Sequence, residues 1–181
     1  MKTLKTFFVL LAVIVASSSY GQTKEETMEW LNTNGRDFLE MSYKNSADFK
    51  MSGELQKIKS DTLIFYQNFY RRCSTCDNIY ETIKVPFNYI KYQEINSIPI
   101  KIADSSTRKF PDGTPYFIVK VNSKFSRVEV GNETNQKWST YGEGTLEIPF
   151  DKANEENAKR ALKAIMHLAK LSGAKENKQT F

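Results

Sequence analysis

Residues 151–174 read DKANEENAKRALKAIMHLAKLSGA, which is the pattern of an amphipathic helix. Apolar residues recur at intervals of three and four, so that they line up along one face of the helix. This apolar stripe consists of Ala158, Ala161, Leu162, Ile165, Leu168 and Ala169. Asp151 can cap the start of the helix, and Gly173 can end it in a left-handed turn. A helix with a single apolar face has to bury that face against the rest of the chain.

The chain before this helix alternates apolar and polar residues with a period of two, which is typical of half-buried strands. One stretch, TLIFYQNFY at residues 62–70, is apolar on both faces and predicts a central strand. The alternation changes parity between Val121 and Val128, which predicts a turn or bulge near residues 122–124. The expected strands, about seven in number, lie at residues 49–58, 62–70, 79–89, 98–102, 117–121, 128–130 and 146–150. We therefore expect an α+β fold in which the closing helix covers an antiparallel sheet or one end of a barrel.

A second helical pattern precedes the strands. Thr23 and Glu26 have the spacing of a capping box. Apolar residues then recur at roughly helical intervals, at Trp30, Leu31, Phe38 and Met41. The polar sequence NTNG at residues 32–35 interrupts them, which predicts either one kinked helix or a short helix followed by a turn. We expect this segment to pack on the domain.

The first 21 residues have the order of a secretory signal peptide. Two lysines precede the apolar run FFVLLAVIVA at residues 7–16, and the small residues Ser19 and Gly21 follow it. As a helix, this run rises about 15 Å, roughly half of a hydrocarbon core, so a membrane anchor is disfavoured. We expect cleavage after Gly21, a periplasmic or extracellular location and no transmembrane segment in the mature chain. A single domain is expected at residues 22–174 and a disordered tail at residues 175–181.

Charge and motif content disfavour several classes of function. If Lys2 and Lys5 leave with the signal peptide, 26 basic residues become 24 against 21 acidic residues, a net charge of about +3. These charges are interleaved, whereas a nucleic-acid interface needs them concentrated, so we expect no nucleic-acid partner. No G-x-S-x-G, Walker A, dinucleotide-binding or H-E-x-x-H motif occurs, and we predict no catalytic residue, cofactor or metal. A hydrolase whose carboxylates pair only in space stays an alternative.

The two cysteines of the chain, Cys73 and Cys76, form a Cys-x-x-Cys motif between two expected strands. A redox-active pair usually lies at the start of a helix, whose N-terminus activates the first thiol. A zinc site usually needs more ligands than the single histidine, His167, could add. A disulfide across a hairpin connection is therefore favoured, and an oxidising compartment supports it. A redox-active pair and half of a metal site stay open as alternatives.

Aromatic residues crowd the region around the central strand. They are Phe65, Tyr66, Phe69, Tyr70, Tyr80, Phe87, Tyr89 and Tyr92. Some of them are expected to line a ligand groove, because tyrosine combines apolar contact with hydrogen bonding. Burial on both faces of the central sheet, together with contact with the helix, is the alternative interpretation and the favoured one.

Two segments at the ends of the mature chain carry a family resemblance: TKEETMEWL at residues 23–31 and ALKAIMHLAKLSGA at residues 161–174. They resemble a group of small exported proteins of Gram-negative bacteria, which are functionally uncharacterised and have a pleckstrin-homology-like (PH-like) domain. The resemblance implies that fold, and it implies no activity. We expect an exported, non-enzymatic domain that binds an envelope protein or a small apolar ligand. A thiol–disulfide protein that uses Cys73 and Cys76 is the alternative.

The reduction potential of the Cys73–Cys76 pair separates its structural and redox interpretations. A structural disulfide is expected to have a potential below about −300 mV, because such bonds resist reduction by glutathione. The measurement is equilibration in redox buffers followed by alkylation and mass spectrometry. A potential of about −120 to −270 mV, together with a rapidly alkylated thiol, would instead support an oxidoreductase.

Overall fold

The computed structural model describes residues 22–45, 49–71, 79–102, 113–122, 125–130, 135–140 and 143–178. The proposed signal peptide and both cysteines lie outside these residues. Cleavage after Gly21 and the pairing of Cys73 with Cys76 therefore stay predictions.

Within the described residues the chain forms two α-helices and nine β-strands. The helices are α2 (Lys24–Phe38) and α3 (Glu155–Leu171). The strands are β1 (Met41–Asn45), β2 (Phe49–Lys59), β3 (Thr62–Arg71), β4 (Ile79–Pro86), β5 (Ile100–Ile102), β6 (Pro115–Val121), β7 (Phe125–Val130), β8 (Asn135–Thr140) and β9 (Gly144–Pro149). Short 3-10 helices are η1 (Phe87–Tyr89), η2 (Ile95–Ser97) and η3 (Lys152–Asn154). No described helix is both long and apolar enough to cross a lipid bilayer.

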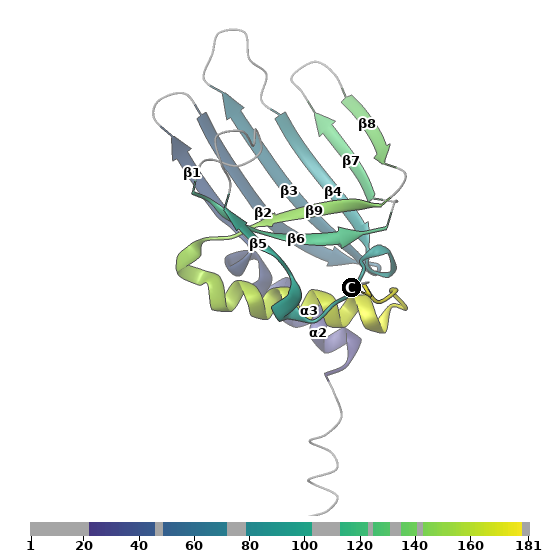
Figure 1. Ribbon diagram of the computed structural model, residues 1–181. Coiled ribbons are helices and arrows are strands. Elements are labelled where there is room, and N and C mark those ends of the chain that lie inside the picture. The colour runs from purple at the N-terminus through teal and green to yellow at the C-terminus, as the bar shows by residue number, and fades with distance from the viewer. Residues whose placement is uncertain are drawn as a thin grey trace, which may run out of the picture.

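The strands form two antiparallel sheets. In the described part of the chain, the larger sheet has six strands in the order β1-β2-β3-β4-β7-β8, and the smaller has three in the order β5-β6-β9. Figure 1 shows β5, β6 and β9 crossing in front of the end of the larger sheet that lies nearest the helices. The predicted α+β class with antiparallel strands and a closing helix is confirmed. The barrel of about seven strands is wrong, because β1 and β8 extend an open sheet.

The change of parity in the sequence marks the place where the chain passes from one sheet to the other. β6 belongs to the smaller sheet and ends at Val121, whereas β7 begins at Phe125 and pairs with β4 in the larger sheet. The chain thus leaves the smaller sheet after β6 and forms the hairpin of β7 and β8 in the larger sheet. It then returns to the smaller sheet with β9, which pairs with β6. Because side chains on one strand alternate between faces, a strand that joins a different sheet is free to change its parity.

The apolar stripe of α3 is buried as predicted. Its six residues are each 0 % exposed and belong to one hydrophobic cluster with core residues of the sheets, such as Val119 and Ile148. The helix ends where Gly173 takes a φ of +77°. There the amide of Gly173 donates to the carbonyl of Lys170, and the amide of Ala174 donates to that of Ala169. These two bonds satisfy carbonyls that the last turn of a helix leaves without partners.

Helix α2 is one continuous helix that begins at a capping box. The Thr23 hydroxyl accepts from the amide of Glu26 at 3.2 Å, and the Glu26 carboxylate accepts from the amide of Thr23 at 2.9 Å. The NTNG sequence does not break the helix, and within it the side chains of Thr33 and Asn34 donate to backbone carbonyls four residues earlier. Gly35 lets the helix approach β2: a Cβ atom there would lie 2.7 Å from Cδ2 of Leu55.

The segment after α3 is paired with the chain near Tyr92. The amide of Tyr92 donates to the carbonyl of Lys175 at 3.2 Å, and the amide of Asn177 donates to the carbonyl of Tyr92 at 2.8 Å. Glu176 thereby forms a parallel bridge with Tyr92. The predicted disordered tail at residues 175–181 therefore needs correction as far as Lys178, since backbone hydrogen bonds hold this part; residues 179–181 lie outside the description.

The close approach of Gly35 to Leu55 predicts that the effect of Gly35→Ala on stability changes sign when Leu55 is truncated. In the wild-type background, Gly35→Ala should destabilise the protein. Overpacking against Leu55 costs about 1–3 kcal/mol, whereas alanine adds about 1 kcal/mol of helix propensity. In a Leu55→Ala background the contact at 2.7 Å is gone and the contact with Cδ2 of Leu31 at 3.2 Å remains, so Gly35→Ala should stabilise by up to about 1 kcal/mol. Urea denaturation of the four proteins measures both effects, and a stabilising Gly35→Ala in the wild-type background would contradict the close approach.

Candidate functional site

The predicted aromatic groove is only partly described. Phe65 and Phe87 are buried and fill the core, so their rings are not open to a ligand. Tyr66, Tyr89 and Tyr92 are half-buried. The side chains of the remaining three residues, Phe69, Tyr70 and Tyr80, lie outside the description. Phe65 and Phe87 therefore cannot line a ligand groove, and a groove lined by some of the other six residues stays a prediction.

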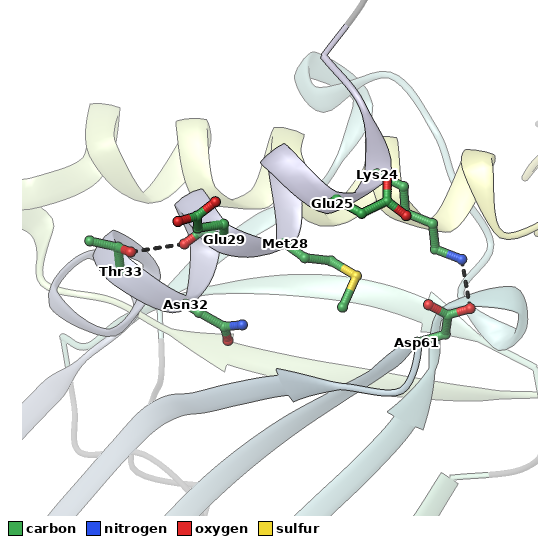
Figure 2. A pocket seen from close by; sticks show the side chains of 7 residues that line it. All are labelled: Lys24, Glu25, Met28, Glu29, Asn32, Thr33 and Asp61. Atoms are coloured by element: carbon green, nitrogen blue, oxygen red, sulfur yellow. Dashed lines mark hydrogen bonds and ion pairs between the residues drawn. The ribbon is translucent and has the colours of Figure 1, made fainter.

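Two other grooves flank helix α2, one on each side. The first, which we call the hairpin groove, has a volume of about 670 Å³ and lies between α2 and the turn that joins β2 to β3. Figure 2 shows the side chains that line it: Lys24, Glu25, Met28, Glu29, Asn32, Thr33 and Asp61. Met28 lies at its centre, and the ion pair of Lys24 with Asp61 closes one end (Figure 2).

Asn32 fastens α2 to the edge of β2. β1 pairs with β2 only as far as Gly53, and none of the described strands pairs with the later residues of β2 on that side. Ile58 lies next to the pair that closes the β2–β3 hairpin, and its backbone groups therefore point away from β3. The side-chain oxygen of Asn32 accepts from the Ile58 amide at 2.7 Å, and its nitrogen donates to the Ile58 carbonyl at 3.3 Å. Asn32 thus takes the place of a neighbouring strand.

The hairpin turn itself is held by side chains of the same groove. Ser60 and Asp61 have φ values of 49° and 59°, in the left-handed region that two-residue hairpin loops require. The Asp61 carbonyl accepts from the amide of Phe87 at 2.8 Å, and its carboxylate binds Lys24 at 2.6 Å. Because Asn32, Lys24 and Asp61 all secure the fold, the hairpin groove has a structural explanation.

The second groove, which we call the interhelical groove, lies between α2 and α3 and has a volume of about 660 Å³. Its lining consists of Gln22, Thr27, Trp30, Arg160, Lys163, Ala164 and His167. Trp30 is half-buried and packs against Phe38, with ring centroids 6.0 Å apart. The guanidinium carbon of Arg160 lies over the Trp30 ring, 5.7 Å from its centroid. The groove therefore combines an aromatic surface with a cation at its rim.

His167 connects helix α3 to the first described residue, Gln22, at this groove. The sequence places it opposite the apolar stripe of α3, as a solvated residue, but its side chain is half-buried. Its Nε2 atom lies 2.9 Å from the carbonyl oxygen of Gln22. A carbonyl can only accept, so Nε2 donates in this contact. Within the described residues no cluster of three or more His, Cys, Asp or Glu side chains could hold a metal ion.

The sequence places Trp30 in a segment that packs on the domain, and it gives no role to the basic face of α3. Their meeting depends on how α2 lies against α3, which no local pattern encodes. The available signal is the spacing of Arg160, Lys163 and His167, which recur at helical intervals along one face. That spacing predicts a basic strip, but it does not predict the aromatic ring beside it.

The role of Asn32 can be tested with Asn32→Leu, which keeps the size of the side chain and removes both hydrogen bonds. We expect a loss of about 1–2 kcal/mol, because the Ile58 amide and carbonyl lose their partners. The control Glu29→Gln, at an exposed position in the same groove, should change stability by less than about 0.5 kcal/mol. Hydrogen exchange of the Ile58 amide should accelerate only in Asn32→Leu, and unchanged exchange would contradict the assignment.

No protein-family model matches the chain, and no curated protein or solved structure is significantly similar to it. The resemblance to exported PH-like proteins therefore stays a prediction. The function has to be inferred from the grooves themselves.

Proposed function

We propose that this chain is an exported, non-enzymatic binding domain that holds a small, largely apolar ligand in the interhelical groove. Export is proposed because a signal-peptide pattern precedes the domain. The observation that carries the binding function is the half-buried Trp30 ring, which faces a groove with a cationic rim. Aromatic side chains that remain accessible in a concave surface are typical of ligand sites.

The size of the groove favours a small molecule over an envelope protein. A volume of about 660 Å³ lies within the range of small-molecule sites, about 300–1,000 Å³. Trp30 and Ala164, which are both half-buried, offer apolar contact in this groove. The hairpin groove on the other side of α2 is of similar size, but its polar side chains already hold the turn and the helix in place.

Ala164 gives a direct test, because it lines the interhelical groove. Ala164→Phe should fill the groove and weaken binding of Nile red, a neutral planar dye, by about tenfold or more, which corresponds to about 1.4 kcal/mol. The matched control is Ala153→Phe, at an exposed position in η3. Fluorescence titration measures the affinities, and thermal melting verifies that both variants are folded. Equal affinities for the dye in all three proteins, or no binding to the wild type, would contradict the proposal.

A further inference from the structure

The two grooves beside α2 differ in charge. The lining of the interhelical groove includes Arg160, Lys163 and His167 and no acidic residue. The hairpin groove instead contains three carboxylates and one lysine. Helix α2 therefore separates an acidic surface from a basic one.

The acidic residues of α3 are already engaged with another lysine. Lys159 binds Glu155 at 3.0 Å and Glu156 at 3.1 Å. Hydrogen bonds to Glu155 and then to Glu156 raise the pKa of Lys159 above its usual value. Lys159 thus remains charged and keeps both carboxylates on its own side of the helix. In the part of the chain that the structure describes, neither Arg160 nor Lys163 has a carboxylate within ion-pair distance.

The contact with Trp30 leaves the hydrogen-bonding capacity of Arg160 unused. A guanidinium group over an aromatic ring is attracted by the electrons of the ring and spends none of its five N–H donors. Among the described residues, Arg160 has no hydrogen-bond acceptor. Lys163 lies one turn further along the same helix face and is exposed, so an acceptor near Arg160 is within reach of a second cation.

We propose that the ligand of the interhelical groove carries a carboxylate or phosphate group on a flat apolar body. This inference rests on the proposed function and specifies the class of ligand. The flat body lies against Trp30, and the acidic group binds Arg160 and Lys163. Arginine suits this task because its planar donors match the oxygens of a carboxylate or phosphate. His167, fixed by Gln22, borders the same site.

The test compares two probes that share one ring system, 2-naphthoate and the neutral 2-naphthalenemethanol. By isothermal titration calorimetry at low ionic strength, the acid should bind about tenfold more tightly than the alcohol. Added salt should reduce this preference, because exposed charges are screened. The double variant Arg160→Gln/Lys163→Gln should lose the preference and keep its affinity for the alcohol. The control Lys152→Gln/Lys175→Gln removes the same charge at exposed positions outside the groove and should keep the preference.

The outcomes separate this inference from the proposed function. Equal binding of both probes to the wild type, or an unchanged preference in the double variant, overturns the acidic ligand and leaves an apolar site. No binding of either probe, with no binding of Nile red, overturns the apolar site as well. Tighter binding of a polyglutamate peptide than of 2-naphthoate overturns the small ligand in favour of an acidic protein segment.

Discussion

Burial of the α3 stripe is the constraint on which the rest of the fold depends. Without it, the helix would expose a continuous apolar face, and the smaller sheet would lose a large part of the cluster that it shares with α3. Three of the six stripe residues are alanines, at positions 158, 161 and 169, so α3 can pack closely on its neighbours. With the stripe turned inward, the opposite face of α3 has to present Arg160 and Lys163 to solvent. The basic rim of the interhelical groove is thus a consequence of core packing.

On the side that faces β2, helix α2 is held by hydrogen bonds. Asn32 replaces a missing strand at Ile58, and Gly35 removes the side chain that would keep the helix away from Leu55. Because these contacts set the distance of α2 from β2, they also set the position of Trp30 relative to α3. Residues of the hairpin groove therefore shape the interhelical groove although they do not line it. The stability of the fold and the shape of the interhelical groove are linked in this way through a single helix.

The sequence predicts those elements of the fold in which apolar residues recur at a regular spacing. The stripe of α3 and the alternating burial of β6 follow from period alone. The edge strands β1 (MSYKN) and β8 (NQKWST) are largely polar and contain no such repeat, so the sequence predicts about seven strands where the described residues form nine. The hairpin turn at Ser60 and Asp61 has no glycine, although both residues adopt left-handed backbone angles, and a bond from Phe87 supplies the support. Tertiary contacts decided these features.

The interhelical groove cannot be predicted from the sequence for the same reason. Because this groove is open to solvent, tight binding needs both the acidic group and the apolar body of the proposed ligand. An ion pair on an exposed surface is worth only about 0–1 kcal/mol, because water competes for both charges. A flat apolar body against Trp30 would exclude water from one side of the guanidinium group and strengthen the pair in the lower local dielectric. The acidic group in turn fixes the orientation of a body that apolar contact alone would leave free to slide. The highest affinity is therefore expected for a ligand that combines the two features, because neither a simple anion nor a neutral ring would use the whole site.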